Sequence, residues 1–197
     1  MARPANTARN GTFAAMTPDQ AYELSRSLLA EPLPRRWAHS QGVAEAAKRL
    51  APILGTYADT LVTAALLHDI GYAPMLASTG FHPLDGARFL REQGQVEVLV
   101  VRLVAHHSFA LLEAEERGLR GELEKFPLPE QGDLVDALAY CDMTTTPDGE
   151  PTTYGERVFE IIGRYGPDSL LGRFIRRAEP EIQAAVERVE ARMSGHR

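Results

Sequence analysis

The sequence is poor in cysteine and in long apolar runs, and both deficits narrow what the protein can be. Its 197 residues include a single cysteine, Cys141, so no disulfide can form within the chain, and a cytoplasmic location is the simplest expectation. No apolar run approaches the roughly 18–20 residues needed to span a bilayer. Residues 1–13 also lack the continuous apolar segment of a signal peptide. We therefore expect no membrane partner, and we predict that residues 1–16 form a disordered tail.

An excess of basic residues is also missing. The 21 lysines and arginines are outnumbered by 27 aspartates and glutamates, which leaves a formal net charge of -6. This balance argues against nucleic acid as a partner, because nucleic-acid binding draws on basic surfaces. It does not exclude a small phosphorylated substrate, since a bound divalent metal can invert the local charge. Nothing in the sequence indicates an oligomeric state.

The alternation of apolar and polar residues that marks β-strands is absent as well, and helical spacing dominates. The composition is that of an ordinary globular protein, with 44% hydrophobic and 24% charged residues. We predict an all-α fold with one helical-bundle domain over residues 17–197. The expected helices lie at about 17–31, 35–52, 59–70, 82–93, 96–107, 133–142, 154–165, 168–178 and 179–193.

Against this apolar background, histidines and aspartates stand at the edges of several predicted helices. Five of the six histidines belong to this set, and only His196 lies outside it. Burying such groups is costly unless they are paired or bind a metal. Imidazole nitrogen and carboxylate oxygen are ligands that iron and manganese accept, so we predict one or two divalent transition metal ions, with iron or manganese favoured. The candidate ligands are His39, His68, Asp69, His82, His106, His107 and Asp142.

The chain order of these residues suggests how they divide. His39, His68, Asp69 and Asp142 would form one site, and His82 and His107 a second, with the two oxygens of Asp69 shared between them. His106 and His107 cannot both point the same way on a regular helix, because neighbours lie about 100° apart.

Each residue also has an ordinary structural alternative. A histidine on an apolar helix is most often a hydrogen-bonded core residue, the His68-Asp69 pair could be a charge pair at a helix end, and Asp142 could be a cap. Such separate roles for five histidines at once are improbable, so we favour the metal site.

The motifs around these residues resemble the HD superfamily of metal-dependent phosphohydrolases, whose signature is His … His-Asp … Asp. Residues 66–71, Leu-Leu-His-Asp-Ile-Gly, are similar to the core motif of its HDIG-type, single-domain bacterial members. The similarity extends over about Arg36 to Asp142. The other matching segments are Arg-Trp-Ala-His-Ser-Gln-Gly-Val at 36–43, His-Pro-Leu-Asp-Gly-Ala at 82–87, His-His-Ser at 106–108 and Ala-Tyr-Cys-Asp at 139–142.

This resemblance implies that His39, His68, Asp69 and Asp142 hold the first metal, and that Asp69, His82 and His107 hold a second. It favours His107 over His106, although members with a double histidine use both. Many phosphodiesterase members carry lysine where this chain has Tyr72, so cleavage of cyclic dinucleotides is in doubt.

The function implied is hydrolysis of a phosphoester or phosphoanhydride of a small molecule by metal-activated water, with a nucleotide or dinucleoside polyphosphate as the leading substrate class. Asp69 would be the catalytic residue, and Arg36, one helical turn before His39, could bind the phosphate. Two alternatives remain open. One is an HD-fold di-iron oxygenase, which would consume oxygen, and the other is a non-catalytic metal-binding regulatory module.

Overall fold

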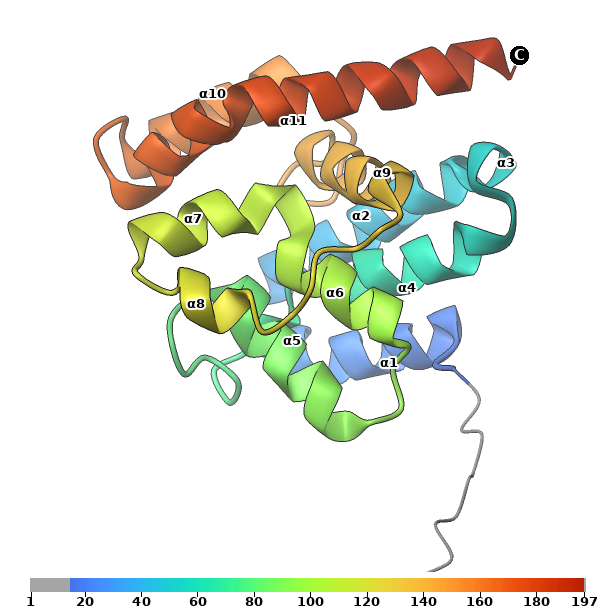
Figure 1. Cartoon of the computed structure of the whole chain (residues 1–197), viewed down its shortest axis with the longest axis horizontal. Helices are drawn as coiled ribbons and strands as arrows, with labels where there is room; N and C mark the ends of the chain where they lie inside the picture. The colour runs from blue at the N-terminus through green and yellow to red at the C-terminus, as the bar shows by residue number, and fades with distance from the viewer. Residues whose placement is uncertain (1–14, 197) are drawn as a thin grey trace, which may run out of the picture.

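The computed structural model describes residues 15–196, and within this range the regular structure is helical apart from one isolated bridge between Thr145 and Pro151. The predicted all-α class is confirmed (Figure 1). The tail predicted at residues 1–16 falls outside the described residues, except for Ala15 and Met16. Met16 packs against the main core.

Most helices begin and end close to the positions expected from the sequence. A capping box formed by Thr17 and Gln20 starts the first helix, and a second one formed by Thr153 and Glu156 starts α10. The α-helices are α1 (Pro18–Leu29), α2 (Pro34–Arg49), α3 (Ala51–Leu54), α4 (Ala58–Leu67), α5 (His82–Gln93), α6 (Val98–His106), α7 (Ala110–Glu116), α8 (Arg120–Leu123), α9 (Gly132–Met143), α10 (Tyr154–Tyr165) and α11 (Leu170–Gly195). Three short 3-10 helices are η1 (Gly55–Tyr57), η2 (Ile70–Tyr72) and η3 (His107–Phe109).

The main core is built around α4, which is buried along most of its length and packs against α1, α2, α6 and α9. Its residues from Leu61 to Leu67 are all buried, so the helix has no solvated face over that stretch. Burial of aliphatic side chains contributes roughly 25 cal/mol per Å² of apolar area. This packing fixes the C-terminal end of α4, from which the His-Asp pair projects.

A second, smaller apolar cluster lies between α10, α11 and the end of α9. Phe174, Ile175, Ile182 and Val186 from α11 meet Val158 and Ile161 from α10 in this cluster. In Figure 1, α11 runs across the top of the molecule with α10 beside it, above α9. The two last helices therefore cover one side of the bundle.

The prediction of two separate helices at 168–178 and 179–193 is wrong, because α11 is continuous from Leu170 to Gly195 and contains Pro180. A proline inside a helix removes one hydrogen bond and crowds the carbonyl four residues earlier. Here Ala178 and Ile182 flank Pro180 and are fully buried. Tertiary packing of both halves against the same cluster outweighs the local cost.

No single helix in the described part of the chain is long and apolar enough to cross a membrane. One pair bent by 60°, residues 34–49 with 51–72, passes that test on length and composition together.

Candidate metal centre

Six of the candidate ligands converge because each stands at or near a helix end that points to the same place. His68 and Asp69 directly follow α4, His82 is the first residue of α5, and His107 directly follows α6. His39 lies in α2 and Asp142 in the last turn of α9. All of them are buried except His82, whose side chain is 13% exposed. Five helices of the bundle thus deliver polar groups to one buried point.

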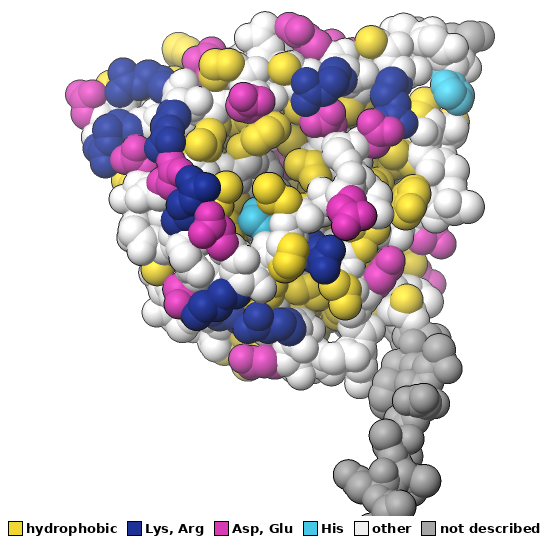
Figure 2. Space-filling view, viewed as in Figure 1, with side chains coloured by type: hydrophobic (Ala, Val, Ile, Leu, Met, Phe, Trp, Pro, Cys, Tyr) yellow, Lys and Arg dark blue, Asp and Glu magenta, His cyan; other side chains and the backbone are white. Residues whose placement is uncertain are grey.

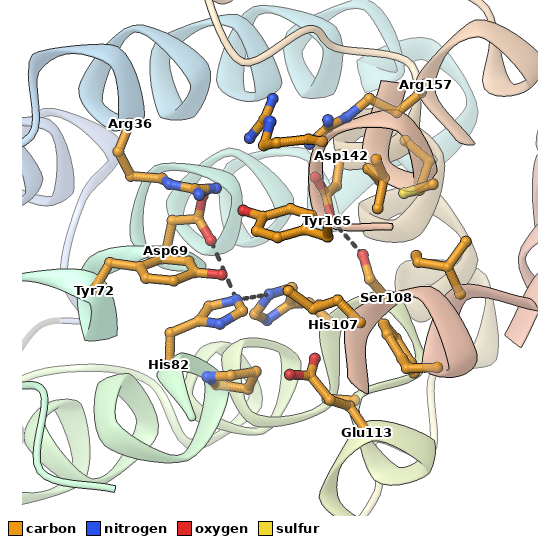
Figure 3. Close-up of a pocket in the computed structure, with 18 residues that line it drawn as sticks. Arg36, Asp69, Tyr72, His82, His107, Ser108, Glu113, Asp142, Arg157 and Tyr165 are labelled. Atoms are coloured by element: carbon orange, nitrogen blue, oxygen red, sulfur yellow. Dashed lines mark hydrogen bonds and ion pairs between the residues drawn. The ribbon is translucent and has the colours of Figure 1, made fainter. Parts of the chain in front are cut away.

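The side chains form two groups. In each group, one ligand atom per residue lies within 4.8 Å of the others: His39, His68 and Asp142 in one, and Asp69, His82 and His107 in the other. Nε2 of His39 lies 3.1 Å from Oδ1 of Asp142, and Nε2 of His82 lies 3.0 Å from Nε2 of His107. Figure 3 shows His82 and His107 side by side beneath Asp69, with Asp142 opposite.

The hydrogen bonds of the histidines leave nitrogen lone pairs facing these groups. Nδ1 of His39 donates to the carbonyl of Thr146 at 2.9 Å, and Nδ1 of His68 to that of Ala65 at 2.7 Å. His107 donates in the same way to Val104 at 2.7 Å. A neutral imidazole that donates through Nδ1 has its lone pair on Nε2. Three such lone pairs, one of them on the buried and unpartnered Nε2 of His68, face carboxylate oxygens or another imidazole. This arrangement of acceptors suits a bound cation, and the Nδ1 bonds to carbonyls are typical of metal-ligating histidines.

Asp69 joins the two groups through its two oxygens. Oδ1 lies 3.3 Å from Nε2 of His82, while Oδ2 lies 3.4 Å from Nε2 of His68 and 3.9 Å from Nε2 of His39. Burial alone would raise the pKa of Asp69, but the charges of Arg36, His68 and His82 hold it well below its usual range. A permanently ionised carboxylate with one oxygen toward each group has the geometry of a bridging ligand.

The charges of both aspartates also act on His68. Burial disfavours its charged form, yet Asp69 and Asp142 together raise the pKa of His68 to about 8. A metal ion that binds Nε2 of His68 would therefore have to displace a proton, which frees the lone pair. By contrast, burial holds the pKa of His82 and of His107 below the ordinary value. The second group therefore keeps two neutral imidazoles, which is the form that binds metal.

Ser108 orients Asp142. Its hydroxyl donates a short hydrogen bond to Oδ2 of Asp142, which leaves Oδ1 facing His39. Ser108 and the next residue, Phe109, have φ of 49° and 59°, in the left-handed region that non-glycine residues rarely adopt. This turn after His107 directs both His107 and Ser108 into the site.

The turn after α9 supplies the carbonyl that orients His39. Its loop docks on α2 with almost no space: a Cβ at Gly149 would lie 2.4 Å from the carbonyl oxygen of Ala38, and one at Gly42 would lie 2.2 Å from that of Gly149. Gly149 also has a φ of 87°, which glycine adopts without strain. The two glycines let the turn approach closely enough for Thr146 to reach His39.

Arg36, predicted to bind the substrate, donates from Nη1 to Oδ2 of Asp69 at 2.8 Å and lies over the ring of Tyr72, 4.1 Å from its centroid. Tyr72 in turn stacks on His82 with ring centroids 4.0 Å apart. Arg36 thus holds Asp69 directly, and through Tyr72 it supports His82. Tyr72 fills the position where many phosphodiesterase members carry lysine.

The structure does not bring His106 to the site. Its Nε2 donates to the carbonyl of Phe126 at 2.6 Å, and neither group of ligand atoms in the described residues includes it. The reason is local: α6 ends at His106, and the backbone of His107 is extended, with a ψ of 149°. The chain turns between the two residues, so their rings separate and His106 stays in the core.

These two adjacent histidines provide a matched pair of variants. We expect His107→Ala to reduce metal content from two equivalents per chain to one, because it removes one of three ligands of the second group. His106→Ala should retain both equivalents and lose only stability, by about 1–3 kcal/mol, since it leaves a buried carbonyl unpaired. Elemental mass spectrometry on both variants is the measurement. A loss of metal from His106→Ala alone would contradict the assignment.

A small pocket with a cavity volume of about 80 Å³ opens above the two groups. Arg36, Asp69, His82, His107 and Asp142 line its floor. The opposite wall comes from α10 and α11, and its residues include Arg157, Arg164, Tyr165 and Phe174. Sequence reasoning missed this wall. In the amphipathic pattern of α10, Arg157 has the same appearance as a surface charge.

Comparison with known proteins supports the pattern of the site. The family described as "HD domain" matches residues 36–143, more than half of the chain. All six converging residues lie inside this range, whereas α10 and α11 lie outside it.

Three curated proteins named Ribonuclease Y match shorter stretches. The protein from Mesoplasma florum is 39% identical over 77 residues, that from Rubrobacter xylanophilus 40% over 70, and that from Opitutus terrae 35% over 81. These stretches cover 39%, 36% and 41% of this chain but only 15%, 14% and 16% of the relatives. The chain therefore spans about one-seventh of their length. No solved structure matches the chain significantly.

Proposed function

The chain belongs to the HD domain family, and from this membership together with the geometry of the site we propose that it is a metal-dependent phosphohydrolase. The observation that supports this most strongly is Asp69, a buried carboxylate that presents one oxygen to each of two ligand groups. His39, His68, Asp69 and Asp142 would hold one divalent metal, and Asp69, His82 and His107 a second. Iron or manganese suits this set of nitrogen and oxygen donors.

Metal bound at such a centre acidifies water toward a pKa near 7 and polarises phosphoryl oxygens. The contribution of the protein is to fix the geometry. Arg36 and Ser108 orient the two carboxylates, and the carbonyls of Ala65, Val104 and Thr146 fix three imidazoles. Arg36 also lines the pocket, and we propose that its remaining donors bind the phosphate of the substrate. Asp69 is the residue that we expect to be indispensable.

For the substrate we propose a phosphoester or phosphoanhydride of a small molecule, with a nucleotide or a dinucleoside polyphosphate as the leading class. The wall formed by α10 and α11 supports this, because it bounds the pocket on the side opposite the ligands. Figure 2 shows that basic and acidic side chains alternate on the visible face and form no continuous basic track. This chain matches about one-seventh of the length of proteins named Ribonuclease Y. That name makes RNA the alternative substrate to test.

The test is a substrate panel with protein reconstituted with manganese, iron or cobalt. The panel contains nucleoside mono-, di- and triphosphates, diadenosine polyphosphates, bis-p-nitrophenyl phosphate and an end-labelled RNA oligonucleotide. We expect release of phosphate or mononucleotide from a small substrate, and no turnover after chelation. Cleavage of the RNA alone would refute the small-molecule substrate. Oxygen consumption with iron, without phosphate release, would favour the oxygenase, and inertness of metal-loaded protein throughout would favour the binding module.

A further inference from the structure

The wall of the pocket opposite the ligand groups carries two arginines from α10, Arg157 and Arg164. They stand seven residues apart, two helical turns, and therefore share one face of the helix. Both line the same pocket as Asp69 and His107. In Figure 3, Arg157 lies above Asp142, on the far side of the pocket from His82. In the described residues, the side-chain hydrogen bonds of both arginines go to Glu160 and not to a candidate metal ligand.

Arg157 is unusually buried for an arginine, with 7% of its surface exposed, and its Nε has no hydrogen-bond partner in the described structure. Arginine carries five N–H donors and is always charged, so a buried guanidinium is costly unless acceptors surround it. Its one carboxylate partner is Glu160, one helical turn away. The donors of Arg157 are therefore incompletely used by the protein.

Glu160 also pairs with Arg164, so one carboxylate serves two guanidinium groups. The other charged groups on the pocket wall are balanced more closely: Arg36 is paired with Asp69, and Glu113 with Arg117. Beside the ligand groups, two guanidinium groups of α10 thus share the single carboxylate of Glu160. Glu160 holds the two guanidinium groups next to one another, which is the arrangement that clamps a phosphate from two sides.

We propose that Arg157 and Arg164 form a second anion site, which binds a phosphate of the substrate other than the one attacked at the ligand groups. This rests on the proposed function and narrows it: the substrate carries at least two phosphates, as a nucleoside diphosphate or a dinucleoside polyphosphate does. Ile161, Leu171 and Phe174 line the pocket next to these arginines and provide an apolar surface for the uncharged part of such a molecule.

The test compares two probes that differ by one anionic group, methylphosphonate and methylenediphosphonate, neither of which has a P–O–P bond to hydrolyse. Their affinities for manganese-loaded protein are measured by calorimetry for wild type, Arg157→Gln, Arg164→Gln and the control Arg188→Gln. Arg188 lies on α11, where it pairs with Asp136 outside the pocket. Arg188→Gln therefore makes the same substitution away from the proposed site. We expect Arg157→Gln to weaken methylenediphosphonate binding about tenfold and methylphosphonate binding less than about twofold. The control should change neither affinity.

Arg164→Gln should weaken methylenediphosphonate binding in the same way, but by less. The side chain of Arg164 is 30% exposed, so this variant tests the site even if Arg157→Gln fails to fold. Equal weakening of both probes, or an unchanged preference for the diphosphonate in both variants, would overturn the second anion site. The readout is binding, so it is separate from the proposed function. If the preference depends on Arg157 and Arg164 but no phosphate compound is hydrolysed, the anion site stands and the hydrolase proposal fails.

Discussion

Replacement of Asp69 by alanine is expected to remove metal from both groups and to lower phosphohydrolase turnover by on the order of 10³-fold or more. The reason is geometric, because this carboxylate alone faces both groups, with Oδ1 toward His82 and Oδ2 toward His68 and His39. Loss of any other ligand leaves one of the two groups complete. Elemental analysis and turnover measured on the same preparation give the two readouts.

The helices should remain formed in Asp69→Ala, since Asp69 lies after α4 and contributes no apolar contact to the core. Far-UV circular dichroism checks this. Asp136→Ala is the matched control, because it removes a carboxylate of α9 that pairs with Arg188 outside the pocket, and it should keep both metals and full turnover. An Asp69→Ala protein that retains wild-type turnover would disprove the assignment of the site.

The substitution Gly71→Ala is expected to destabilise the fold by about 2–4 kcal/mol and to disrupt the second ligand group. Gly71 ends the His-Asp-Ile-Gly motif and packs directly on the start of α5. A Cβ at this position would lie 2.0 Å from the carbonyl oxygen of His82 and 2.7 Å from the amide nitrogen of Gly86. Backbone atoms cannot yield as a flexible side chain can, so α5 must move, and His82 moves with it away from Asp69.

Gly163→Ala is the appropriate comparison. Gly163 lies inside α10, and a Cβ there would have nothing within 4 Å. Its replacement should stabilise the protein by about 0.5–1 kcal/mol, because alanine favours helix over glycine. Urea unfolding of both variants, together with metal content, measures the difference. Equal stability of the two variants, with both metals retained in Gly71→Ala, would show that the close contact of η2 with α5 is not needed.

The motif therefore has two physical parts. His68 and Asp69 are present for their ligand atoms, and this chemistry could be interpreted from the sequence. Gly71 is present for its lack of a side chain, and its partner, His82, is eleven residues further along the chain. The reason for that glycine is a contact between two backbones, which no local pattern shows.

Much of the fold followed from local signals. The periodic apolar positions predicted most of the longer helices to within a few residues. The exception was α11, which was predicted as two helices that meet between residues 178 and 179. Local propensity counts against proline in a helix, but only the tertiary structure shows that Ala178 and Ile182 are buried on either side of it.

The sequence by itself determined the all-α class and the residue types of the candidate site, because helical periodicity and ligand chemistry depend on residues near one another in the chain. The tertiary structure decided which histidine of the pair His106 and His107 enters the site, and how Asp69 divides its oxygens. It also decided that α10 and α11 close the pocket with Arg157 and Arg164. These outcomes depend on contacts such as that of His39 with Asp142, 103 residues apart, and such contacts form only when the helices pack.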